Sequence, residues 1–136
     1  MRFTTRLILV GAMAVLAIAI SAGSASATIS SFTVDPKGTL ADGGTHVTVS
    51  GTITCLEGDS VTVFVGLSQV VGRLSRGAST STSIFCTGTT QPWSVTLSAV
   101  VVLPFVPGRA ALNAQAADFT DFSPPAFVNR AIVLTR

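Results

Sequence analysis

The sequence predicts an all-β protein that folds as an antiparallel sandwich of about seven to eight strands. After position 27, apolar residues recur at every second position, and no window shows the period of an amphipathic helix. Clusters of Gly, Pro and Asp interrupt this alternation at intervals of about 10–15 residues, which is typical of turns between short strands. Strands that are apolar on one face only are typical of antiparallel sheets, so we expect two such sheets packed face to face.

Residues 1–27 are predicted to be a secretory signal peptide, and residues 28–136 a single β-sandwich domain. Arg2 and Arg6 precede an apolar run at residues 7–20 and a stretch of small residues that ends in Ala-Ser-Ala. This order is typical of a cleaved leader. The apolar run is shorter than the roughly 20 residues of a membrane-spanning helix, so no stable membrane span is expected; an uncleaved N-terminal anchor is the alternative. We therefore expect a secreted, extracellular protein, and the bias to Ala, Gly, Thr and Val suggests a bacterial source.

The predicted domain carries no net charge. Arg2 and Arg6 account for the excess of the whole chain, which leaves six basic and six acidic residues after position 27. A neutral domain without a basic cluster offers no footprint for nucleic acid or for an anionic membrane surface. The expected partner is an unknown protein, a cell-surface component or a small apolar ligand, and not a nucleic acid.

Cys55 and Cys86 are the only cysteines of the chain. Behind a signal peptide, two cysteines predict one disulfide bond, with two free thiols as the alternative. The bond would close a loop of about 30 residues and stabilise the fold by about 3 kcal/mol.

The clearest strands are predicted at residues 46–55 and 61–68, where aliphatic residues recur at every second position; in the second of these strands Phe64 falls on the opposite face, with Thr62, Gly66 and Ser68. Residues 57–60, Glu-Gly-Asp-Ser, form a turn between them, which predicts a hairpin. Further strands are expected at residues 29–34, 70–75, 79–86, 93–99, 109–116 and 127–135, with 70–75 and 79–86 as edge strands.

The predicted domain contains the short motifs Val34-Asp35-Pro36, Gly43-Gly44, the strand Val47-Thr48-Val49-Ser50-Gly51, and Gly58-Asp59. These motifs resemble those of secreted bacterial immunoglobulin-like sandwich domains. The Gly-Thr…Cys…Cys layout is similar to that of uncharacterised secreted actinobacterial domains, which implies a fold and no activity. The same opening is similar to the enediyne-antibiotic apoproteins of the neocarzinostatin type, over about residues 30–66. That resemblance implies a β-sandwich with a cleft for a small ligand. The chain departs from it in having a single pair of cysteines and no recognisable counterpart of the aromatic-lined cleft.

The sequence shows no reaction chemistry, and we expect no enzyme. A Ser/His/Asp site needs a histidine base. His46 is the only histidine and falls on the polar face of a predicted strand. One histidine and a disulfide leave no ligand set for zinc, so no metal and no cofactor are expected. Calcium held by Asp118 and Asp121 is the alternative to simple turn residues in that loop.

Two apolar features are open to a structural or a binding interpretation. Trp93 alternates with core positions, so a buried tryptophan is favoured over an exposed sugar platform. Residues 99–106 lose the alternation; burial under a loop is favoured, and an exposed docking patch is the alternative. The candidate apolar binding patch consists of Val101, Leu103, Phe105, Phe119 and Phe122.

The preferred hypothesis is a secreted, non-enzymatic module with a binding or structural role. The second is a small apolar-ligand carrier of the apoprotein type, with a cleft near residues 99–106 and 119–127. A small secreted hydrolase is a third, for which no feature of the sequence argues.

Overall fold

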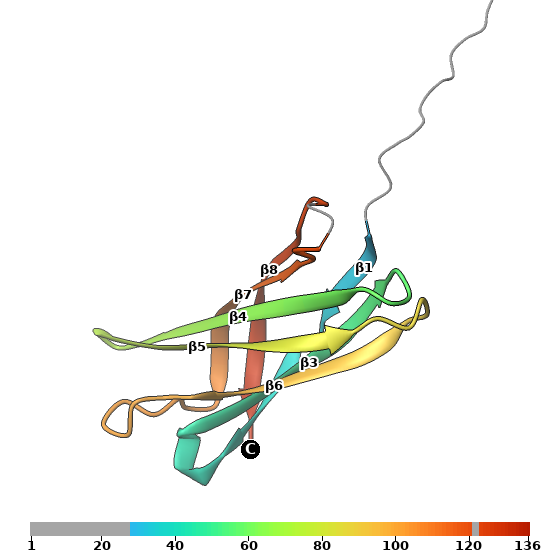
Figure 1. Ribbon diagram of the computed structural model, residues 1–136. Helices are drawn as coiled ribbons and strands as arrows, with labels where there is room; N and C mark the ends of the chain where they lie inside the picture. Colours follow the sequence, from blue (N-terminus) through green and yellow to red (C-terminus); the bar gives the residue numbers. More distant parts are fainter. Residues whose placement is uncertain (1–27, 121–122) are drawn as a thin grey trace, which may run out of the picture.

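The computed structural model describes residues 28–120 and 123–136, and the predicted signal peptide lies outside them. These residues form an all-β sandwich, as predicted (Figure 1). The part described contains no helix long and apolar enough to cross a membrane. The strands are β1 Ile29–Val34, β2 Lys37–Ala41, β3 His46–Cys55, β4 Ser60–Val71, β5 Leu74–Phe85, β6 Gln91–Ser98, β7 Gly108–Ala117 and β8 Ala126–Thr135, with a short 3-10 turn, η2, at Asp42–Gly44.

The first layer is built around β3, and the second has the order β8-β7-β4-β5. One edge of β3 pairs with β6, and the other pairs first with β2 and then with β1. β2 also pairs with β8, with Lys37 opposite Val133, so it connects the two layers at one side. This β2–β8 pair is parallel, whereas every other strand pair in the described residues is antiparallel as expected.

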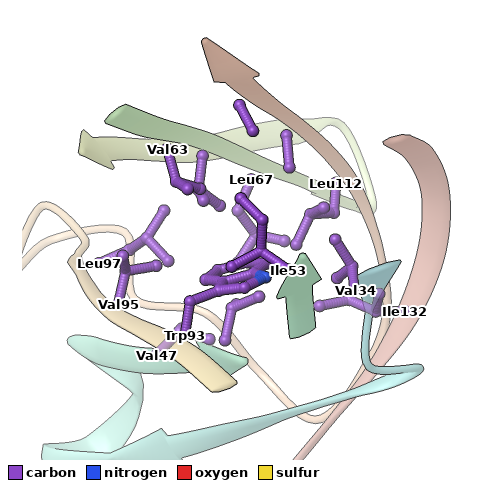
Figure 2. Packing of buried hydrophobic residues seen from close by; sticks show 14 of the residues in the cluster. Val34, Val47, Ile53, Val63, Leu67, Trp93, Val95, Leu97, Leu112 and Ile132 are labelled. Carbon is purple, nitrogen blue, oxygen red and sulfur yellow. The ribbon is translucent and has the colours of Figure 1, made fainter. Parts of the chain in front are cut away.

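The core lies between the layers and follows the alternation read from the sequence. β3, β4, β6 and β7 each bury every second residue over most of their length. Figure 2 shows these side chains filling the space between the layers, with Trp93 near the centre. The largest fully buried side chains are Phe105, Ile53, Leu97, Ile132 and Leu134.

Trp93 is a core residue, in agreement with the favoured interpretation. Its side chain is 3% exposed, stacks on Phe32 with ring centroids 5.6 Å apart, and donates its indole N–H to the carbonyl of Thr33 at 3.1 Å. A Cβ at Gly51 would lie 1.9 Å from that carbonyl oxygen and 2.9 Å from the indole. Glycine at position 51 therefore lets β1 approach β3 while the indole lies against both.

The predicted hairpin between residues 46–55 and 61–68 is wrong. β3 and β4 are both strands, but they lie in opposite layers: β3 pairs with β1, β2 and β6, and β4 with β5 and β7. The Glu57–Ser60 segment crosses between layers because its backbone bonds to Cys86: Gly58 donates to the Cys86 carbonyl, and the Cys86 amide donates to Asp59.

The edge strands predicted at 70–75 and 79–86 are parts of one longer hairpin. Residues 70 and 71 end β4, Gly72 turns the chain with φ of 64°, and β5 then runs unbroken to Phe85. β5 pairs with β4 alone, so its place at the edge is confirmed. β2 was not predicted, because a five-residue segment with a glycine carries little alternation.

The Cys55–Cys86 disulfide is confirmed. The cysteines are 31 positions apart, their Cα atoms are 5.4 Å apart, and both are buried. The bond joins the last residue of β3, in the first layer, to the residue that follows β5, in the second. It therefore connects the two layers at the end of the sandwich where the chain crosses between them.

Replacing both cysteines, as Cys55→Ala with Cys86→Ala, is expected to lower the free energy of unfolding by about 3–4 kcal/mol. Without the bond, the unfolded chain gains the conformational entropy that closing a loop of this length removes. Urea unfolding measures the loss. A reducing agent should lower the stability of the wild type and leave the double variant unchanged. Equal urea midpoints for oxidised and reduced wild type would contradict a structural role for the bond.

Candidate ligand-binding site

The outward face of the β8-β7-β4-β5 layer brings distant residues into rows across four strands. Alternation turns Val63 and Val65 of β4 into the core, so Phe64 and Gly66 face outward. Strand register places Ser81 and Gln115 on either side of Phe64, and Phe127 beyond Gln115. The next row runs from Ser79 through Gly66 and Asn113 to Asn129.

These rows border a hollow of about 470 Å³ on the surface of the layer. None of its lining residues among those described is charged. Asn113 and Gln115 make no side-chain hydrogen bond to another described residue, so their amides are available to a bound molecule. The lining consists of Phe64, Val65, Gly66, Ser79, Thr80, Ser81, Asn113 and Gln115.

Gly66 keeps the floor of the hollow open. A Cβ at this position would lie 2.9 Å from Oδ1 and 3.4 Å from Nδ2 of Asn113. A larger residue would displace the Asn113 side chain and occupy part of the hollow. Because the far end of a flexible side chain can move, this change should alter the surface and leave the strand pairing intact.

Phenylalanines border one end of the hollow. The ring of Phe119 stands edge-on to that of Phe64, with centroids 6.4 Å apart. Phe64, Phe119 and Phe127 are 41%, 65% and 62% exposed, although large apolar side chains are usually buried in a core of this size. Exposed aromatic rings grouped on one face are typical of surfaces that bind something.

Asp118 holds the backbone on either side of Phe119. Its Oδ1 accepts hydrogen bonds from the amide of Thr120, at 2.9 Å, and from the Thr120 hydroxyl. Burial raises the pKa of Asp118, but the hydrogen bond from the Thr120 hydroxyl, the side-chain hydrogen bond shared with Asp59 and the bond from the Thr120 amide outweigh this effect. The pKa of Asp118 therefore lies below its ordinary value of 3.8.

The structure separates the residues of the predicted apolar patch. Val101 is 77% exposed, Leu103 is half-buried and Phe105 is 1% exposed, all in the segment that joins β6 to β7. Phe119 lies at the opposite end of the sandwich, after β7, and Phe122 is outside the described residues. The favoured burial of residues 99–106 is correct for Phe105 and wrong for Val100, Val101 and Val102, because the latter form an exposed turn.

The sequence also singled out His46 and the acidic residues of the loop after β7. His46 is on the outward face of β3, as predicted, and its Nδ1 lies 2.9 Å from Oδ2 of Asp42. No group of three His, Cys, Asp or Glu side chains in the described ranges could hold a metal ion. Asp121, the second residue of the calcium alternative, is outside those ranges.

The hollow itself was not predicted. Alternation placed Phe64 and Gly66 on the outward face of one strand, and Asn113 and Gln115 on that of another. What brings them together is the β4–β7 register, in which Phe64 is opposite Gln115 and Gly66 is opposite Asn113. That register cannot be read from a single sequence, because the partners are 51 positions apart for Phe64 and Gln115 and 47 apart for Gly66 and Asn113.

Asp118→Asn is expected to lower the free energy of unfolding by about 1–2 kcal/mol at neutral pH, through weaker bonds from Thr120. Since the folded-state pKa is below 3.8, the ionised carboxylate stabilises the fold above that pH. This stabilisation is lost as the pH falls through the lower, folded-state pKa. Urea unfolding at decreasing pH measures this effect. The free energy of unfolding should fall less for Asp118→Asn than for the wild type or for the exposed control Asp35→Asn. Identical acid slopes for all three proteins would contradict the role of Asp118.

Comparison with known proteins gives a family. A family model described as a family of unknown function, DUF6299, matches residues 28–128. That match covers the predicted domain from its first residue into β8 and excludes the predicted signal peptide. No curated protein matches the chain, so the resemblance to neocarzinostatin-type apoproteins stays an expectation. The chain belongs to the DUF6299 family.

Proposed function

We propose that this protein is a secreted, non-enzymatic binding module and that the hollow on the β8-β7-β4-β5 layer is its ligand site. The observation that carries the proposal is an uncharged hollow in which the exposed ring of Phe64 lies beside the side-chain amides of Asn113 and Gln115. Secretion is supported by the predicted leader and by the buried disulfide, since such bonds persist in oxidising compartments.

The chemistry of the hollow selects a flat, neutral ligand. A volume of about 470 Å³ is within the range of sites that take a small molecule. The faces and edges of Phe64 and Phe119 offer stacking partners to a planar ring. The amides of Asn113 and Gln115 can each donate and accept a hydrogen bond, so a hydroxyl or carbonyl group on the ligand would be recognised. A charged ligand would find no opposite charge among the lining residues.

A carrier of a wholly apolar ligand, as in the apoproteins of the neocarzinostatin type, is the second candidate. It is favoured by the three exposed phenylalanines at one border, Phe64, Phe119 and Phe127. The two candidates differ in whether the side-chain amides of Asn113 and Gln115 form hydrogen bonds with the ligand. A carrier should bind naphthalene as tightly as 2-naphthol, whereas the proposed site should prefer 2-naphthol.

We expect 2-naphthol, added to isotope-labelled protein, to shift the NMR signals of Phe64, Gly66, Asn113 and Gln115. The anion 2-naphthoate has the same ring system and should bind at least tenfold more weakly, since burying its charge without a partner is costly. Gly66→Val fills the hollow and should abolish the shifts while changing the free energy of unfolding by less than about 1 kcal/mol. Thr96→Val, at an exposed position of the other layer, is the matched control and should bind as the wild type does.

The proposal fails if neither naphthalene nor 2-naphthol shifts these four signals in a folded protein. It also fails if Gly66→Val and Thr96→Val bind 2-naphthol equally, because the ligand would then lie elsewhere.

A further inference from the structure

Aliphatic side chains project from two neighbouring turns at the end of the sandwich opposite the disulfide. The turn between β4 and β5 exposes Val70, Val71 and Leu74 by 70%, 40% and 56%. The turn that follows β6 exposes Val100, Val101 and Val102 by 61%, 77% and 80%. Together we call these six residues the aliphatic tips.

The two turns are tied to each other at their bases. Gln69 exchanges hydrogen bonds with the backbone of Val106, at 2.8 and 3.0 Å. Arg76 donates to the carbonyl of Pro104 at 2.6 Å. Figure 1 shows the β4–β5 turn and the β6–β7 connection projecting on the same side of the molecule. The aliphatic tips therefore project from the same side of the molecule, and hydrogen bonds connect their two turns at the base.

Charge is segregated along the sandwich although its sum is zero. Arg73, Arg76 and Arg109 lie at or just behind the aliphatic tips, and Arg136 lies beside η2 at the same end. The acid at this end is Asp42, whose Oδ2 lies 2.9 Å from Nδ1 of His46. The disulfide end carries Glu57, Asp59 and Asp118 and no basic residue among those described.

This combination fits the surface of an anionic lipid bilayer. Projecting aliphatic side chains can enter the boundary between headgroups and acyl chains, and apolar burial and attraction to anionic lipids add together. Arg73 lies between Val71 and Leu74, so insertion of its turn brings the guanidinium to the level of the headgroups. The acidic end then points away from the membrane, which avoids repulsion.

We propose that the aliphatic tips and the arginines behind them dock this protein peripherally on membranes that contain anionic lipid. The site is distinct from the hollow, which opens on the outward face of the β8-β7-β4-β5 layer. Docking through the tips leaves that face accessible.

Vesicle co-sedimentation tests the proposal, with residues 28–136, which hold all eight strands and the whole described core. The protein should bind vesicles of phosphatidylglycerol mixed with phosphatidylcholine, and bind pure phosphatidylcholine vesicles far less. Added salt should weaken binding, because it screens the arginines. Arg73→Gln should weaken binding about fivefold. Val101→Ser with Val102→Ser should weaken it about tenfold.

Two control variants match these changes away from the aliphatic tips. Lys37→Gln removes an exposed positive charge from β2, and Leu56→Ser an exposed aliphatic side chain at the disulfide end. Both control variants should bind vesicles as the wild type does. Because every substituted position is exposed, circular dichroism should show that all the variants are folded. Equal losses in control and tip variants would overturn the assignment to this end.

Failure to bind phosphatidylglycerol vesicles beyond pure phosphatidylcholine would overturn the proposal as a whole. So would concentration-dependent self-association without vesicle binding, if sedimentation shows that Val101→Ser with Val102→Ser abolishes it. That result would assign the aliphatic tips to contacts between copies of this chain.

Discussion

The passage of the chain from one layer to the other between Cys55 and Ser60 is the constraint on which the rest of the structure depends. The disulfide joins Cys55 to Cys86, and backbone hydrogen bonds from and to Cys86 fix Gly58 and Asp59 beside it. The end of β3, the start of β4 and the end of β5 are therefore held at one point. Had β4 turned back along β3 as a simple hairpin, its outward residues would lie in the other layer, and Phe64 would not lie between Ser81 and Gln115.

The crossing gives the two ends of the sandwich different characters. The disulfide end gathers acidic side chains and the loop in which Asp118 holds Thr120 next to Phe119. The opposite end gathers arginines and exposed valines. A net charge of zero does not reveal this difference, because the net charge does not record where the charged residues lie in the fold. Electrostatic arguments about partners therefore need the fold as well as the composition.

Much of the architecture could be predicted, because alternation is a local property. The buried face of β3, with Val47, Val49 and Ile53, follows directly from the period of two. The disulfide was also predictable, since the chain has one cysteine pair. The pairing of the strands could not be predicted. No local sequence signal indicates that β3 and β4 lie in different layers, or that β2 pairs in parallel with β8. Pairing of distant strands depends on which register buries the apolar faces of all strands together.

The candidate site was harder to predict than the fold for the same reason. The patch predicted from the sequence combined apolar residues of two loops, such as Val101 and Phe119. The structure places these two loops at opposite ends of the sandwich. The hollow instead combines two or three residues from each of β4, β5 and β7, of which Asn113 and Ser79 carry no functional signal in their own segments. Only a register that places Gly66 opposite Asn113 makes them neighbours.

Intermolecular nuclear Overhauser effects between 2-naphthol and the protein would show whether the hollow is the ligand site. We expect contacts from the naphthol ring protons to the ring of Phe64 and to the side-chain amide of Asn113, which come from two strands and meet only at the hollow. Contacts confined to residues outside the hollow, or no contacts from a ligand that binds, would contradict this assignment.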